Sequence, residues 1–276
     1  VPVGVEHGTV AVLDRRNRLH EVTTFRRDVV TDGRHAIVQF GVSLDDDLAR
    51  RDFTINAIAY HPLRHEWRDR FDGAADLERT LIRAVGDPAQ RFREDYLRIL
   101  RMLRFAARFG FTIDPATWEA AKSHIAGLEH LSAERVRDEW FKGLKTAQRP
   151  AELLRMWKEI GALERRLPEV SGERYAGADV AAALDRFQVK DPVLMTASLS
   201  ADPVATLTRL RSSNADIERG RRIAEHREHW PDPASPAAVR RWMAAAGPAV
   251  DDLVAIARAE GRGEPLAKAV AAVRKS

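Results

Sequence analysis

The pattern of apolar residues changes near residue 76. Before it, short segments alternate β-branched and polar residues, which predicts strands at "HGTVAVL" (7–13), "HEVTTFR" (20–26), "AIVQF" (36–40) and "EWRDRF" (66–71). After it, apolar residues recur at helical spacing along most of the chain. Together the two patterns predict an α+β fold, with a small mixed sheet near the N-terminus and a long all-α remainder.

Local signals refine this division. The polar "DRRNR" (14–18) suits a hairpin turn, "RRDVVTDGRH" (26–35) suits a charged loop, and "DGAAD" (72–76) suits a turn. Ser43 is a candidate N-cap for a helix whose first turn is acidic. Further helices are predicted over 76–85, 93–109, 114–125, 132–144 and 150–163, with the polar stretch 171–179 interrupting the helical region.

Composition excludes several classes of protein. The 276 residues carry a formal charge of +4 and contain no cysteine, which rules out disulfides, thiolate metal sites and a cysteine nucleophile. The sequence pI near 9.6 favours an anionic partner. No apolar run reaches the length of a membrane span, so we expect no membrane partner, and a reducing cytoplasm is compatible with the lack of cysteine.

The stretch "RRDFTINAIAYHP" (50–62) raises a question about its polar side chains. Helical spacing places Asp52 and Asn56 on one face, with Arg50 and Arg51 at the start of that face. An ordinary solvated face of a surface helix and a binding site are both consistent with this stretch taken alone.

The helix predicted over 93–109 carries Asp95, Arg98 and Arg101 three residues apart. A surface ion pair between Asp95 and Arg98 is one explanation, and it would contribute only a few tenths of a kcal/mol. Ionised Asp accepts hydrogen bonds and Arg donates them. The pair therefore matches the amino group and bare ring nitrogen of cytosine and adenine, and opposes uracil and guanine. Such a helix can select nucleotides without a template.

Several strings occur together in the order typical of one enzyme family. They are "EVTTFR", "DDLARRDFTINAIAY", "RFDGAADL", "LIRAVGDPAQRFREDYLRILRMLRFAARFGF" and "SAERVRDEW". On these strings the chain resembles the bacterial class II tRNA nucleotidyltransferases, the CCA-adding enzymes, with poly(A) polymerases as close relatives. The resemblance is dense to about residue 140 and thinner beyond residue 150. It implies a partial nucleotidyltransferase head of the polymerase β type, over 1–75, a helical neck over 76–147 and a helical body over 148–276.

The resemblance also implies roles for residues. Asp52 would accept from the ribose hydroxyl, Arg51 would contact the triphosphate, and Arg50 and Asn56 would support this nucleotide-binding segment. Asp95 and Arg98 would contact the edge of the base, with Glu94 and Arg101 as supports. The segment Arg70, Phe71, Asp72, Gly73 corresponds to the family's Pro-Phe-Gly-Gly hinge between head and neck.

Family members carry an Asp-x-Asp strand near the start of the head, whose carboxylates bind two magnesium ions. The sequence has no such motif ahead of Val1, so we expect it to be a piece of a longer product, inactive as it stands or completed by a separate chain. Glu21 matches a third acidic position of the family and is the candidate catalytic and metal-binding residue, although one carboxylate is a poor site for two cations. Asp45 and Asp47 also form Asp-x-Asp, but acids at a helix N-terminus are ordinary.

The predicted activity is addition of C and A to the 3′ end of tRNA from CTP and ATP, with Mg²⁺ and release of pyrophosphate. Poly(A) synthesis, CC-only or A-only addition, and an inactive module that binds RNA or nucleotides remain alternatives. In the body, basic clusters are candidate contacts to tRNA phosphates: Arg209, Arg211, Arg219, Arg221 and Arg222. The residues Trp118, Trp140, Trp157, Trp230 and Trp242 are predicted to lie in the core.

Overall fold

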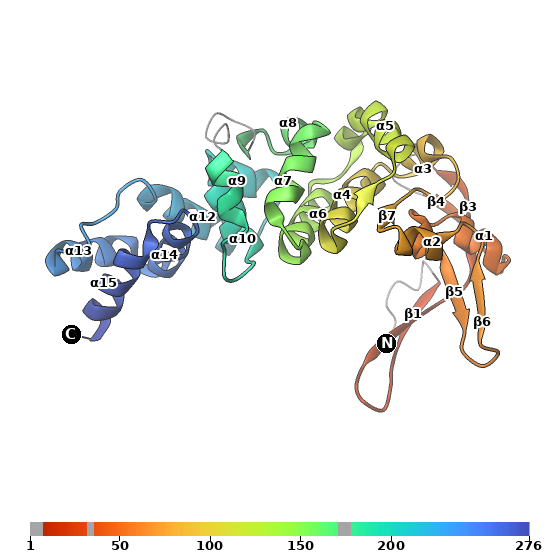
Figure 1. The fold of residues 1–276 in the computed structure, drawn as a ribbon, viewed down its shortest axis with the longest axis horizontal. Helices are drawn as coiled ribbons and strands as arrows, with labels where there is room; N and C mark the ends of the chain where they lie inside the picture. The colour runs from red at the N-terminus through yellow and green to blue at the C-terminus, as the bar shows by residue number, and fades with distance from the viewer. Residues whose placement is uncertain (1–7, 32–35, 171–177, 276) are drawn as a thin grey trace. The chain divides into compact units, whose positions relative to one another are not determined.

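The computed structural model describes residues 8–31, 36–170 and 178–275. Its internal contacts divide the chain into two compact units. Unit 1 comprises residues 1–98 and 113–124, and unit 2 comprises residues 99–112 and 125–276. Figure 1 traces the elements in chain order. Among the described residues, strands occur only up to Ile113 and helices occupy most of the rest, which confirms the α+β prediction.

Unit 1 contains antiparallel strand pairs and short helices. The pairs are β1 (Thr9–Leu13) with β2 (Leu19–Thr23), β3 (Arg26–Thr31) with β4 (Ala36–Phe40), and β5 (Ile58–His61) with β6 (Glu66–Asp69). The other elements are α1 (Leu44–Ala49), a 3₁₀ turn η2 (Thr54–Asn56), α2 (Gly73–Glu78), β7 (Leu81–Ile82), α3 (Pro88–Glu94) and α5 (Pro115–Ser123). Residues 26–31, predicted as loop, form a strand because they pair with β4.

The start of α1 follows its local signals. Ser43 Oγ accepts from Asp46 N at 3.2 Å, and Asp46 Oδ2 accepts from Ser43 N at 3.3 Å, so the cap satisfies two donors that the helix leaves unpaired. The predicted N-cap is therefore confirmed. Leu48, Ala57 and Val85 form a buried cluster beneath this helix.

Two predicted helices of unit 1 are wrong. α1 ends at Ala49, so 50–62 does not form the predicted α-helix. Phe53 instead forms a β-bridge with Ala84, and residues 58–61 form β5, which pairs with β6. The stretch 76–85 leaves the helix at Glu78, and Thr80 has a φ of 52°. Residues 83–85 then pair with 52–54, since Thr54 N donates to Arg83 O and Val85 N to Asp52 O. This pairing between distant segments overrides the local helical pattern. The predicted turn at 72–76 is instead the start of α2.

Unit 2 is largely helical. Helix α4 (Leu97–Phe109) begins in unit 1 and lies mostly in unit 2, and β8 (Thr112–Ile113) follows it. The remaining elements are η3 (Ile125–His130), α6 (Ala133–Thr146), α7 (Pro150–Glu159), α8 (Ala162–Arg166), η4 (Pro168–Val170), α9 (Ala178–Leu184), α10 (Pro192–Leu199), α11 (Pro203–Arg209), α12 (Asn214–His226), α13 (Pro236–Ala246), η6 (Gly247–Ala249), α14 (Val250–Ala259) and α15 (Gly263–Lys275). The polar stretch predicted at 171–179 lies mostly outside the described residues.

Tryptophans anchor the core of unit 2. Trp140 and Trp157 are buried and meet edge to face, with ring centroids 4.8 Å apart. Trp140 Nε1 donates to Thr196 Oγ1 at 2.9 Å, so the buried indole nitrogen has a partner. Trp242 is also buried, while Trp118 and Trp230 are half-buried. The core prediction is thus confirmed for three of the five tryptophans.

Candidate nucleotide site

Both arginines that follow α1, Arg50 and Arg51, form ion pairs with one carboxylate, that of Asp47. Asp47 is almost fully buried, and its Oδ1 accepts from Arg50 Nη2 at 2.7 Å while its Oδ2 accepts from Arg51 Nη2 at 2.8 Å. Burial raises the pKa of Asp47, but hydrogen bonds from Arg51 and Arg50 outweigh it, so the pKa lies below its ordinary value. Arg50 also donates to Arg26 O, whereas 44% of the Arg51 side chain is exposed. Arg51 is therefore the better placed of the two to meet an anion.

Asp52 and Asn56 lie together as predicted, although not on a helix. Asn56 Nδ2 donates to Asp52 Oδ1 at 2.9 Å, and Phe53 N donates to the same oxygen. The 3₁₀ turn at 54–56 brings the two side chains into contact across four residues. The Asp52 carboxylate is thus buried and oriented.

A buried carboxylate braces this turn from α2. Asp76 Oδ2 accepts from Thr54 Oγ1 at 2.6 Å and from Arg83 Nε at 2.9 Å. Gly73 begins α2 so close to the turn that a Cβ there would lie 2.2 Å from Thr54 O. The close approach requires glycine, and it packs the backbone of α2 directly against the loop that carries Asp52.

The helix predicted over 93–109 is interrupted at Asp95. α3 ends at Glu94, Asp95 adopts an extended conformation with φ −157° and ψ 105°, and α4 begins at Leu97. Asp95 Oδ1 accepts from Leu97 N at 3.0 Å, so its carboxylate caps the new helix. The orientation of Asp95 is therefore set by this cap and not by the periodicity of one continuous helix.

Glu94 is the ion-pair partner of Arg98. Its Oε2 accepts from Arg98 Nη1 at 2.7 Å, and its Oε1 accepts from Arg91 Nη2 at 2.5 Å. All three side chains are largely buried. The predicted support of Arg98 by Glu94 is consistent with this geometry, while the surface ion pair between Asp95 and Arg98 is replaced by one between Glu94 and Arg98.

The segments singled out from the sequence meet through arginines. Arg98 Nη2 donates to Arg50 O at 2.9 Å, and Arg91 Nη1 donates to Ala49 O at 3.0 Å. Both donors fasten the α3–α4 junction to the end of α1. The sequence analysis did not single out Arg91; its spacing of three residues from Glu94 is the signal that could have found it.

Two further residues, Arg101 and Glu21, were also predicted to take part in the site. Arg101 belongs to unit 2, where its Nη1 lies 3.9 Å from Glu139 Oε1. Glu21 is exposed on β2. Across the described residues, no three His, Asp or Glu side chains form a group that could hold a metal ion. Those residues therefore do not fit a two-metal centre, and Glu21 stays a predicted ligand.

Asp45 forms ion pairs with two other arginines. It accepts from Arg68 Nε at 2.8 Å and from Arg70 Nη1 at 2.8 Å. The hydrogen bond from Arg68, aided by that from Arg70, lowers the pKa of Asp45 to about 2. Asp45 and Asp47 thus bind different arginines, which agrees with a structural role for this Asp-x-Asp string.

The arginines predicted to bind RNA all form ion pairs in unit 2. Arg209 pairs with Glu169, Arg211 with Glu134, and both Arg221 and Arg222 with Glu218. Arg219 differs because it bridges Asp191 and Asp252 at 2.7 Å each, and the hydrogen bonds that it donates to Asp252 raise its pKa. Since 67% of its side chain is covered, Arg219 is the least accessible of the five.

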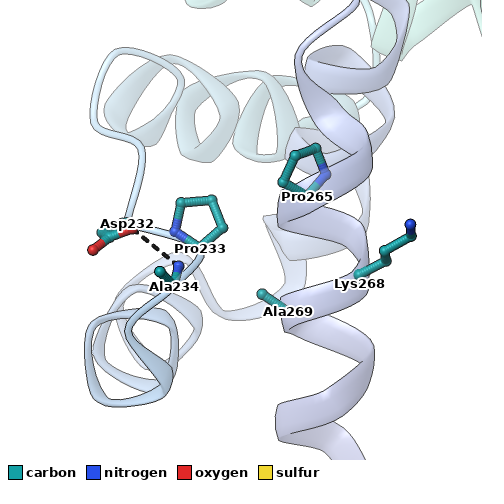
Figure 2. A pocket seen from close by; sticks show the side chains of 6 residues that line it. All are labelled: Asp232, Pro233, Ala234, Pro265, Lys268 and Ala269. Atoms are coloured by element: carbon teal, nitrogen blue, oxygen red, sulfur yellow. Dashed lines mark hydrogen bonds between the residues drawn. The ribbon is translucent and has the colours of Figure 1, made fainter.

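An open pocket of about 600 Å³ lies in the C-terminal part of unit 2 (Figure 2). Its lining is mostly small and apolar: Asp232, Pro233, Ala234, Pro265, Lys268 and Ala269. Asp232 Oδ1 accepts a hydrogen bond from Ala234 N at 2.9 Å (Figure 2). None of the residues predicted from the sequence lines it. In the described part of the chain, every helix is too short or too polar to cross a bilayer.

Two family models match the chain in succession. The model described as "Poly A polymerase head domain" matches residues 1–83, and "Probable RNA and SrmB- binding site of polymerase A" matches residues 110–173. The first match contains Asp52 and its loop. The second contains α5 to α8.

The chain is also similar to individual proteins and solved structures. A CCA-adding enzyme of Streptococcus thermophilus is 47% identical over 156 residues, which cover 52% of this chain and 38% of that protein. The matched part thus spans well under two thirds of that curated relative. The crystal structure of the Bacillus stearothermophilus CCA-adding enzyme in complex with CTP has a TM-score of 0.79 at 30% identity, covering 99% of this chain and 67% of the other. The Thermotoga maritima enzyme complexed with tRNA shares the fold, with a TM-score of 0.66 at 19% identity, covering 98% and 67%.

Proposed function

Because this chain belongs to the family of CCA-adding enzymes and poly(A) polymerases, we propose that it acts in the template-independent addition of C and A to the 3′ end of tRNA. In this nucleotidyl transfer the terminal hydroxyl attacks the α-phosphate of CTP or ATP. A phosphodiester bond forms, the bond to pyrophosphate breaks, and the hydroxyl proton is lost. We further propose a cytoplasmic reaction, and a head over 1–75, a neck over 76–147 and a body over 148–276.

One observation carries the proposal. The hydrogen bond from Arg98 Nη2 to Arg50 O joins the segment proposed to bind the sugar and phosphates to the segment proposed to select the base. Arg51 would meet the triphosphate through its exposed guanidinium, and Asp52 would accept from the ribose hydroxyl. Asp95 and Arg98 would pair with the base edge, with Glu94 and Asn56 holding their neighbours in place. Arg50 would fix the loop, and Arg101 stays a predicted support.

Selection of the base would follow from hydrogen-bond chemistry. Cytosine and adenine present a donor beside an acceptor, which match Asp95 and Arg98. Uracil and guanine would leave unpaired groups, at a cost of about 1–3 kcal/mol for each one desolvated. The same pair of residues thus would admit two nucleotides and oppose two.

Family chemistry uses a divalent metal ion, and Mg²⁺ is the ion we propose. The described residues contain no group of three acidic or histidine side chains able to hold this ion. In the body, we propose that Arg209, Arg211, Arg221 and Arg222 contact tRNA phosphates, with Arg219 contributing least because two carboxylates hold it.

The decisive experiment is equilibrium binding of CTP, ATP, UTP and GTP to this chain and to Arg98→Ala. We expect CTP and ATP to bind more tightly than UTP and GTP, and the variant to lose the difference. Arg93→Ala is the matched control, because Arg93 lies exposed on α3 beside Glu94 yet outside the network. Unchanged discrimination in Arg98→Ala would overturn the assignment.

A second candidate is a binding module without catalysis, which the lack of a metal-holding group in the described residues favours. Incorporation of labelled CTP and ATP into tRNA lacking its CCA end separates the two. Product of one to three nucleotides supports CCA or partial addition, a long A tract supports poly(A) synthesis, and nucleotide binding without incorporation supports the module.

A further inference from the structure

The last turns of α4 alternate arginines with stacked phenylalanines. Phe105 and Phe109 are four residues apart, and their rings are nearly parallel, with an interplanar angle of 7° and centroids 5.9 Å apart. The Arg104 guanidinium carbon lies 4.2 Å from the centroid of Phe105, and that of Arg108 lies 5.2 Å from the centroid of Phe109. Arg101 lies 5.3 Å from Phe105. We refer to these five residues as the aromatic–arginine face of α4.

This face carries excess positive charge. Arg104 donates to Glu139 Oε2 at 2.5 Å, and Arg101 lies 3.9 Å from the other oxygen of the same carboxylate. Arg108 is exposed and contacts the ring of Phe109, and it forms no ion pair with any described residue. Two guanidinium groups of the face therefore lie at the buried Glu139 carboxylate, and Arg108 carries its charge at the exposed end of the face.

The exposed end offers two kinds of contact together. Phe109 is 37% exposed, so part of its ring is open to a flat partner, and the adjacent Arg108 is open to an anion. A nucleotide of RNA that is not base-paired presents both a flat base and a phosphate. Stacking on aromatic rings with support from arginine is the way that proteins bind single strands without reading sequence. A base pair in the interior of a duplex has both faces covered by its neighbours.

We propose that the Phe109 ring and the Arg108 guanidinium bind one unpaired nucleotide of RNA, the ring stacking on the base and the guanidinium contacting its phosphate. Arg104 and Phe105 position the pair from the preceding turn. The inference rests on the proposed function in taking RNA as the partner, and it adds a site outside the residues assigned above to nucleotide and tRNA contacts.

Binding of a short fluorescein-labelled oligocytidine RNA to the whole 276-residue chain, followed by anisotropy, tests the stacking contact. We expect Phe109→Ala and Phe109→Leu each to weaken binding about tenfold, and Phe109→Trp to stay within about threefold of wild type. A blunt RNA duplex of equal length should be bound equally well by all four proteins. If Phe109→Leu binds like wild type, the ring makes only an apolar contact and the proposal is wrong. The comparison of Leu with Trp decides the matter even if the Ala variant fails to fold.

The charge contact has its own test. Arg108→Gln should weaken oligocytidine binding and reduce the slope of log affinity against log salt by roughly 0.7, the value for one phosphate of a single strand. Arg240→Gln removes the same charge from the exposed surface of α13 and should leave the slope unchanged. Equal effects of the two substitutions would show a general charge effect and overturn the site.

The two proposals fail separately. If CTP and ATP selection is absent while the Phe109 and Arg108 variants lose RNA binding, the proposed function fails and the face stands. If selection is present while those variants bind oligocytidine normally, the face fails and the proposed function stands.

Discussion

Two arginine-rich regions of this molecule place their guanidinium groups against different acceptors. Around the loop after α1, Asp47 and Glu94 each hold two arginines, and three of these four side chains are no more than 16% exposed. On the aromatic–arginine face of α4, Arg101 and Arg104 lie at Glu139, and these two and Arg108 all lie over phenylalanine rings.

The acceptors explain the difference. In unit 1 the guanidinium groups also donate to backbone carbonyls, so they fix the path of the chain. A ring accepts no such directional bond, so an arginine over a ring keeps N–H groups that can turn to a ligand. The number of arginines in a segment thus says little about binding until their acceptors are known.

The largest loss of stability is expected at Arg104, which both donates to a buried carboxylate and lies over a phenylalanine ring. Glu139→Ala should lower the free energy of unfolding by about 3–5 kcal/mol, because it leaves a buried guanidinium without its carboxylate. Urea denaturation measures this loss. Glu134→Ala on the same helix removes an exposed pair with Arg211 and should cost much less. Equal losses would mean that the Arg104 pair is not buried in solution.

The substitution Asp47→Ala tests the arginines that follow α1. Removing the carboxylate releases Arg50 and Arg51 together, so we expect a loss of about 2 kcal/mol in the free energy of unfolding and weaker binding of CTP. Asp47→Asn keeps an oxygen acceptor and should lose about half as much. CTP affinity that is unchanged in Asp47→Ala would show that Arg51 needs no anchor.

A pair of lysine substitutions sharpens the comparison directly. Arg98→Lys should cost about 1 kcal/mol, because one ammonium group cannot reach Glu94, Arg91 O and Arg50 O at once. Arg108→Lys should leave thermal stability unchanged, since a lysine can also lie over the Phe109 ring. Calorimetry on both variants provides the test, and similar losses would contradict the distinction between the regions.

The smallest expected effect is the loss of stability at low pH when Asp45 is protonated. Since Arg68 and Arg70 hold the pKa of Asp45 near 2, below its ordinary value of 3.8, the pairs stabilise the fold above about pH 4 and lose this contribution as the pH falls toward 2. NMR titration of the Asp45 carboxyl should show the low midpoint, and Arg68→Gln should raise it. A midpoint near 3.8 in the unsubstituted chain would contradict the pairing.

Local chemistry was predicted well from the sequence. Ser43 and Asp46 form their capping box within four residues, and Asn56 at the end of the 3₁₀ turn reaches Asp52 just ahead of that turn. The order of strands and helices followed from the change of pattern near residue 76. Each of these features depends on residues that are neighbours in the chain.

The failures have long-range causes. The helix predicted over 76–85 gave way to pairing with 52–54, about 30 residues earlier. Arg98 donates to a carbonyl 48 residues away, a contact for which the local pattern carries no signal. The break at Asp95 was missed because the apolar periodicity continues through it, while the carboxylate instead caps a second helix.

The contact of Gly73 with Thr54 O has a consequence for motion. A hydrogen atom in place of a side chain lets two stretches of backbone touch, and Asp76 joins the same stretches through Thr54. The turn at 54–56 and the first turn of α2 should therefore open to solvent as one cooperative unit, with amides that exchange for deuterium at matching rates. A loop expected to bind and release nucleotides would then share its rate of opening with a helix that touches none of them.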